Sequence, residues 1–86
     1  MQVDGAIIKE QNVTFAIVIV KPHVLTNSLE CDKMRKAFQP YFPGLPIVLM
    51  AQDHNGRPTY QGRKDLVNFL ANIDPGRIPW KRFTIN

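Results

Sequence analysis

Hydrophobic positions along the 86-residue chain fall into strand-like and helix-like patterns. Two stretches contain consecutive apolar positions, namely Phe15–Val20 within residues 13–21, a stretch rich in β-branched side chains, and Ile47–Ala51. Such runs are typical of strands that are buried on both faces of a sheet. A shorter apolar stretch at residues 6–9 predicts another strand before a turn at 10–12. Pro22 lacks the backbone donor that continues a ladder, so the second strand is expected to end there.

Two further stretches carry apolar residues at helical spacing. In the first, they recur at intervals of three and four residues, at Cys31, Met34, Phe38 and Tyr41. Asn27 is placed to cap the start of this helix, and Pro40 ends it near residue 39 because proline disfavours helical geometry in the preceding residue. In the second, residues 63–73, the i, i+3, i+4, i+7 set comprises Leu66, Phe69, Leu70 and Ile73. Both patterns predict amphipathic helices.

A hairpin is predicted at Asn55-Gly56, because this pair suits a two-residue type I′ turn. Pro58 in the returning strand places that strand at a sheet edge, where a missing donor is tolerated. A last short strand is expected around Phe83 and Ile85, whose apolar side chains alternate with polar ones.

The predicted element order is β-β-α-β-β-α-(β). Burying the apolar faces of two helices and of the strands favours one small mixed sheet with both helices packed on it. We therefore expect a single α/β (α+β) domain spanning residues 1–86. A hydrophobic fraction of 44% is that of a globular chain rather than a disordered one.

Several classes of function are disfavoured by what the chain lacks. No apolar run approaches the ~20 residues of a membrane-spanning helix, and no signal-peptide pattern is found, so a cytoplasmic protein without membrane contact is expected. Cys31 is the only cysteine and has no internal disulfide partner. His23 and His54 lack the spacing of a helical metal pair, so we expect no metal and no cofactor. No nucleophile–base set or carboxylate pair stands out, so we expect no enzyme.

The formal net charge of +4 is unevenly distributed. Residues 1–56 carry five basic and five acidic groups, whereas residues 57–86 carry six basic groups and two acidic ones. The whole positive excess therefore lies in the last third of the chain. This bias favours acidic partners, although +4 is modest for a nucleic-acid-binding protein.

The basic last third contains two candidate sites. Gly62, Arg63 and Lys64 stand where the second helix begins, and free helix amides with two nearby cations are suited to an anion. The alternative, which we favour, is that Gly62 provides a bend while Asp65 balances the helix dipole. The second candidate is a basic–aromatic surface of the kind that stacks nucleic-acid bases, and a scatter of solvated charges is its favoured alternative. This surface would comprise Arg57, Trp80, Lys81 and Arg82.

Cys31 is a candidate reactive thiol because it lies in the first turns of a helix, where the macrodipole lowers the pKa of a thiol. It also lies on the apolar stripe of that helix, and free cysteines are commonly buried core residues. Glu30 and Asp32 on either side oppose a thiolate. We favour the structural role over a redox or sensor role.

One stretch of the chain resembles a known family. Gly44-Leu45-Pro46 enters an apolar strand, Asn55-Gly56 and then Gly62 follow, and a helix with Phe69-Leu70 comes last. This succession in residues 44–73 resembles the C-terminal half of thioredoxin-like proteins. The resemblance implies a thioredoxin-like fold and a cis bond at Leu45-Pro46. Because no Cys-x-x-Cys motif is present, it implies a redox-silent relative kept for binding or assembly.

The sequence therefore predicts a small non-catalytic α/β module that binds a protein partner or assembles with itself. A homodimer would form by pairing through the edge at Arg57–Gln61 or through the first strand. One alternative is anion or nucleic-acid binding through the basic C-terminal third. Another is a single-thiol redox protein that uses Cys31.

Overall fold

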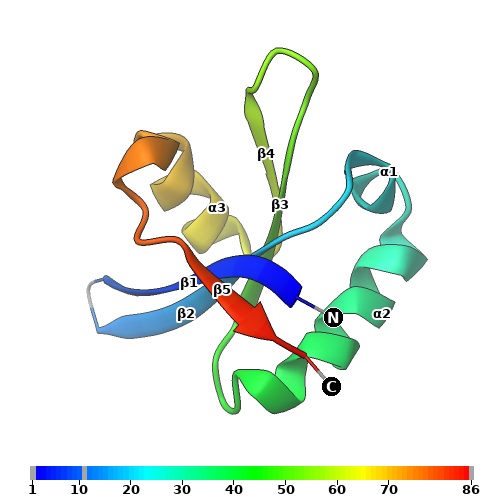
Figure 1. The fold of residues 1–86 in the computed structure, drawn as a ribbon. Helices are drawn as coiled ribbons and strands as arrows, with labels where there is room; N and C mark the ends of the chain where they lie inside the picture. Colours follow the sequence, from blue (N-terminus) through cyan, green and yellow to red (C-terminus); the bar gives the residue numbers. More distant parts are fainter. Residues whose placement is uncertain (1, 11, 86) are drawn as a thin grey trace.

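The computed structural model of the protein describes residues 2–10 and 12–85. Its strands form one five-stranded sheet in the order β4-β3-β2-β1-β5 (Figure 1). β2 and β3 run parallel, and the other neighbours run antiparallel. The bounds are β1 (Gln2–Glu10), β2 (Val13–Ile19), β3 (Ile47–Gln52), β4 (Pro58–Gln61) and β5 (Lys81–Thr84). The predicted mixed α+β sheet fold is confirmed at this level.

Helices cover both faces of the sheet (Figure 1). On one face lie α1 (Pro22–Leu25) and α2 (Ser28–Phe38), which connect the parallel strands β2 and β3, and on the other lies α3 (Lys64–Ala71). Two 3₁₀ turns follow the longer helices, η1 (Gln39–Tyr41) and η2 (Pro75–Arg77). The predicted order contained neither α1 nor these turns. β2 ends at Ile19, two residues before the predicted end at Lys21. Pro22 begins α1, because the first turn of a helix needs no donor from proline.

The core has two layers, one on each side of the sheet. In β2, Ala16 and Val18 face α2, whereas Phe15 and Ile17 face α3, and all four are fully buried. The prediction that this strand is buried on both faces is confirmed. The helix caps also follow the sequence, since the Asn27 side chain accepts hydrogen bonds from the amides of Leu29 and Glu30.

β1 is longer than predicted and lies inside the sheet. It pairs with β2 on one side and with β5 on the other, so the first strand offers no edge for a second copy of the chain. The edges are β4, as Pro58 predicted, and β5. β5 joins β1 because Phe83 lies opposite Val3 and packs its ring against Phe42, with ring centroids 5.2 Å apart. The middle of the predicted turn at 10–12, residue 11, lies outside the described residues.

The β3–β4 hairpin forms, but its predicted two-residue type I′ turn is wrong. The strands are joined by five residues, 53–57, and Gly56 has a positive φ of +80° while Asn55 does not. The Asp53 carboxylate accepts hydrogen bonds from the amides of Asn55 and Arg57, and the Asp53 carbonyl accepts one from Gly56. Aspartate first and glycine last is the preferred pattern of a type I turn, which here overrides the Asn-Gly pair.

The cis bond that the family resemblance implied at Leu45-Pro46 is not found, since no peptide bond within residues 2–10 and 12–85 is cis. None of the helices described is long and apolar enough to cross a membrane.

Candidate functional site

The sheet opens at one end, between β1 and β2. The β1–β2 ladder runs from Glu10 opposite Val13 to Gly5 opposite Val18 and stops there. Beyond this point β1 stays paired with β5, as far as Gln2 opposite Thr84. β2 stays paired with β3, as far as Ile19 opposite Met50. The sheet therefore divides on the N-terminal side of Gly5 into two parts, one made of β1 and β5 and the other of β2, β3 and β4.

Gly5 is required where the two halves part. A Cβ atom at this position would lie only 2.7 Å from the carbonyl oxygen of Ile17, which is backbone and cannot move aside like a side chain. Glycine within a strand often marks such a close approach of two backbones. The absence of a side chain at Gly5 thus allows β1 to cross closely over β2 before it diverges.

One backbone amide lies at the opening, directly after β2. Ala16 and Val20 donate their amides to Pro46 and Met50 on the β3 side. Because backbone groups alternate in direction along a strand, those of Ile17, Ile19 and Lys21 point toward β1 instead. The last β1–β2 pair joins Gly5 to Val18, and the described residues form no further pair of these two strands. The Lys21 amide lies beyond this pair and has no backbone acceptor among the described residues.

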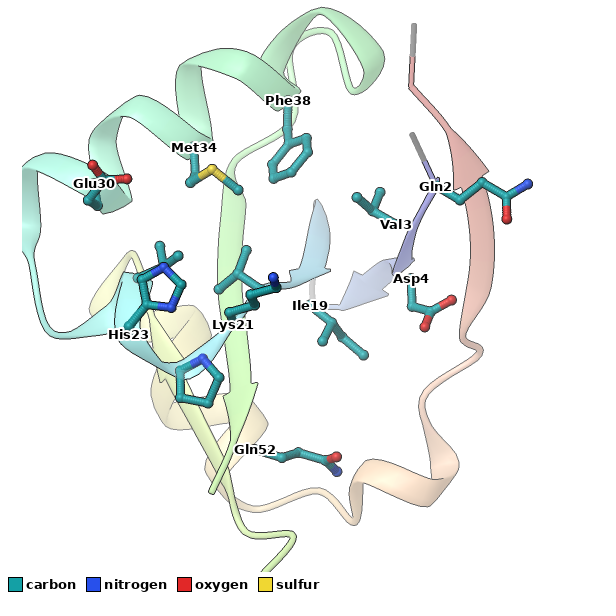
Figure 2. Close-up of a pocket in the computed structure, with 13 residues that line it drawn as sticks. Gln2, Val3, Asp4, Ile19, Lys21, His23, Glu30, Met34, Phe38 and Gln52 are labelled. Atoms are coloured by element: carbon teal, nitrogen blue, oxygen red, sulfur yellow. The ribbon is translucent and has the colours of Figure 1, made fainter. Parts of the chain in front are cut away.

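The opening is the mouth of a groove of about 780 Å³. Figure 2 shows β1 with Val3 and Asp4 on one side, α2 with Met34 and Phe38 on another, and Ile19 and Lys21 at the end of β2. The groove lies at the carboxyl ends of the parallel strands β2 and β3, which is where open α/β sheets commonly bind ligands. Its volume falls within the ~300–1,000 Å³ typical of ligand sites.

The floor of this groove, hereafter the β1–β2 groove, is apolar and its rim is polar. The apolar lining comprises Val3, Ile19, Val20, Val24, Met34 and Phe38. The rim contains acidic and basic groups, namely Asp4, Lys21, His23 and Glu30. The Asp4 carboxylate accepts a hydrogen bond of 3.3 Å from Arg82, so one acid is already paired. An apolar floor with a few polar groups suits an uncharged ligand better than a polyanion.

No protein-family model, no curated protein and no solved structure matches the chain.

The predicted anion site at Gly62, Arg63 and Lys64 already contains a carboxylate. Arg63 donates two hydrogen bonds, of 2.8 and 2.7 Å, to the side chain of Asp65. A Cβ at Gly62 would meet the backbone of Val48 at 3.3 Å, so glycine relieves a tight contact where the chain packs against β3. The favoured structural interpretation therefore has a physical basis at Gly62 and at Arg63. External anion binding here remains a prediction.

The contact between Arg63 and Asp65 predicts a lowered pKa for the Asp65 carboxyl group. The Arg63 guanidinium holds the pKa of Asp65 at about 2, well below its ordinary value of 3.8. Because the folded-state pKa is depressed, the stabilising contribution is full above pH ~4 and is lost as pH falls toward 2. Carboxyl-carbon NMR titration of the native chain should give this value, and Arg63→Gln should raise the pKa of Asp65. A pKa of Asp65 near 4 in the unaltered chain would contradict the contact.

The predicted basic–aromatic surface is not assembled. Arg57 lies in the hairpin beside β4, whereas Lys81 and Arg82 lie on β5 at the opposite edge of the sheet (Figure 1). Trp80 packs against the α3-side core and donates its ring N–H to the carbonyl of Pro75 at 3.1 Å. These residues therefore do not form one continuous face for stacked bases. Nucleic-acid binding through a smaller subset remains a prediction.

Cys31 is fully buried in the α2-side core, and its thiol donates to the carbonyl of Val24 at a distance of 3.3 Å. This environment suits the structural role. We expect Cys31 to react with 5,5′-dithiobis(2-nitrobenzoate) at least about 100-fold more slowly in the native chain than in denaturant, because burial excludes the reagent. An exposed cysteine on the same helix, Lys33→Cys, is the matched control. Equal rates at both positions would instead support the redox alternative.

Sequence patterns gave little indication of the β1–β2 groove. Its lining comes from β1, the end of β2, α1 and α2, and only the three-dimensional arrangement brings these together. One local signal was present, since Gly5 interrupts a strand-like stretch and an isolated glycine in a strand suggests a bulge or close approach. No group of three or more metal-ligating side chains is found in the described part of the chain.

Proposed function

We propose that this chain is a small non-catalytic binding module and that the β1–β2 groove is its binding site. The opening of the sheet beyond Gly5 and Val18 carries this proposal, because a strand ladder that ends above an apolar floor leaves apolar surface for a partner. Binding here needs no catalytic group.

Other surfaces support the proposal less well. The β4 edge contains Pro58, and the β5 edge is a four-residue strand that contains Lys81 and Arg82. Proline, short length and positive charge are features that discourage strand pairing at sheet edges. Assembly of two copies through an edge is therefore the less favoured form of the module. A distant relation to thioredoxin-like proteins remains a separate proposal, which rests on residues 44–73 alone.

The test is whether an uncharged apolar probe enters the groove. With indole added to the methyl-labelled native chain, we expect NMR shift changes at Val24 and Met34 of the groove. Val67, packed against the α3-side core, serves as the reference. Met34→Gln should weaken indole binding about threefold to tenfold, since it replaces apolar surface of the groove.

Leu29→Gln is the matched control. Leu29 lies on the same helix but is 71% exposed and does not line the groove, so this change should leave indole binding unaltered. Shift changes confined to the α3 side, no shift changes at all, or equal weakening in both variants would contradict the groove as binding site.

A further inference from the structure

We propose that Asn55 is a site of spontaneous deamidation and that the Asp53 carboxylate controls its rate by holding the turn between β3 and β4 closed. The proposal concerns a covalent change in this turn. It does not depend on the β1–β2 groove, so it and the proposed function succeed or fail separately.

Deamidation begins when the backbone nitrogen of Gly56 attacks the side-chain carbonyl carbon of Asn55. A C–N bond forms, the side-chain nitrogen leaves as ammonia with the proton that Gly56 gives up, and the product is a five-membered succinimide. Water then adds to one of the two succinimide carbonyls and opens the ring, which leaves either aspartate or isoaspartate at position 55. Water is the only co-reactant, and nothing is oxidised or reduced.

The turn presents the reacting atoms to water, since Asn55 and Gly56 are both exposed. Glycine has no Cβ, and the place where one would lie has no neighbour within 4 Å, so nothing obstructs the nitrogen as it approaches Asn55. Asn55 is the only asparagine of the chain that precedes glycine. Asn27 precedes serine, and its side-chain oxygen already accepts the amides of Leu29 and Glu30 at the start of α2.

Hydrogen bonds to Asp53 restrain the reacting nitrogen. The Gly56 amide donates to the Asp53 carbonyl at 2.9 Å, so its proton is engaged. The Asp53 carboxylate accepts the amides of Asn55 and Arg57, each at 2.9 Å, and the Asp53 amide donates to the Arg57 carbonyl at 3.0 Å. Ring closure requires the peptide plane between Asn55 and Gly56 to rotate, which breaks the hydrogen bond of Gly56. Deamidation therefore proceeds from an opened turn, and its rate follows how often the turn opens.

Opening of this turn is expected to be local. Residues 53–57 are all exposed, and β4 is a four-residue strand at the edge of the sheet that begins with Pro58. Exposed loops beside short edge strands open at a small fraction of the free energy of global unfolding. The native chain is therefore expected to deamidate at Asn55 without unfolding, at a rate below that of the unfolded chain.

The first experiment measures the reaction itself. The native chain is incubated in warm, mildly alkaline buffer, next to the same chain in guanidinium chloride, and peptide mapping by mass spectrometry follows every asparagine. We expect both aspartate and isoaspartate at position 55, formed at least about fivefold more slowly in the native chain than in guanidinium chloride. Aspartate without isoaspartate would overturn the succinimide step. Equal rates in the two states, no reaction of the native chain, or a faster reaction at another asparagine of the native chain would overturn the proposal as well.

The second experiment tests the role of Asp53 with two variants. Asp53→Ala removes the side chain that accepts the amides of Asn55 and Arg57, whereas Asp53→Asn removes the charge but keeps a side-chain oxygen that accepts hydrogen bonds. We expect Asp53→Ala to deamidate at Asn55 about threefold to tenfold faster than the unaltered chain, and Asp53→Asn to stay within about twofold of it. The amide NMR spectrum of each variant, unchanged outside the turn, is the control for folding.

Three outcomes of the second experiment contradict control by the turn. Equal rates of Asp53→Ala and the unaltered chain would mean that the carboxylate does not restrain the turn. Equal acceleration in both variants would assign the effect to the charge of Asp53 rather than to its hydrogen bonds. In guanidinium chloride all three chains should react alike, so an acceleration of Asp53→Ala that persists there would assign the effect to the local sequence.

Discussion

Replacing Phe15 with alanine is expected to destabilise the protein by about 3–5 kcal/mol. Phe15 is fully buried in β2, and its ring meets Phe69 of the α3 side edge-on at 6.4 Å between centroids. The substitution removes this contact and leaves a cavity that a close-packed core fills only in part. Small domains are stable by about 5–15 kcal/mol, so the variant is expected to lose a large share of that stability.

Urea unfolding followed by circular dichroism measures the change, with thermal unfolding as a second observable. Leu29→Ala is the control, because it also shortens a large apolar side chain, but one that is 71% exposed on α2. It should change the free energy of unfolding by no more than about 0.5 kcal/mol. A Phe15→Ala variant as stable as Leu29→Ala would mean that α3 does not pack on the sheet as described.

Gly5→Val is the second substitution with a large expected effect. The new Cβ would begin 2.7 Å from the Ile17 carbonyl oxygen, and the branched side chain adds further atoms at the same crossing. β1 must then move away from β2, which we expect to reduce the free energy of unfolding by about 1–3 kcal/mol, as overpacking generally does. The groove should change shape as well, because Gly5 ends its β1–β2 ladder.

Gly76→Ala is the matched glycine control. Its Cβ would meet only the flexible side chain of Asp74, at 3.3 Å, and its φ lies outside the positive range. The free energy of unfolding of Gly76→Ala should therefore lie within about 0.5 kcal/mol of that of the unaltered protein. Gly5→Val with unaltered stability and unaltered indole binding would show that the two strands do not cross closely at this position.

Much of the framework follows from local pattern. The β-branched runs became β2 and β3, and the i, i+3, i+4, i+7 set became α3. Asn27 caps α2 as its side-chain chemistry predicts. These features depend on residues close in sequence, whose periodicity and capping act before any long-range contact forms.

The parts that sequence did not predict depend on distant segments. β1 became an interior strand because β5, more than 70 residues later, pairs with it. The turn after β3 depends on the Asp53 carboxylate, which outweighs the preference of the Asn-Gly pair. The β1–β2 groove exists because β1 remains paired with β5 while β2 remains paired with β3. No single stretch of sequence specifies that these two pairs of strands diverge. No single groove residue therefore carries a sequence signal for binding, and the site appears only when the fold brings these residues together.

Amide hydrogen exchange of the native chain, without ligand, tests the opening of the sheet most directly. Ile17 is paired with Ala6 and should exchange slowly, whereas the Lys21 amide, which lies beyond the last β1–β2 pair and has no backbone acceptor among the described residues, should exchange at least about 100-fold faster. Equal and strong protection of Ile17 and Lys21 would mean that the β1–β2 ladder continues as far as Gln2, and there would then be no groove to bind a partner.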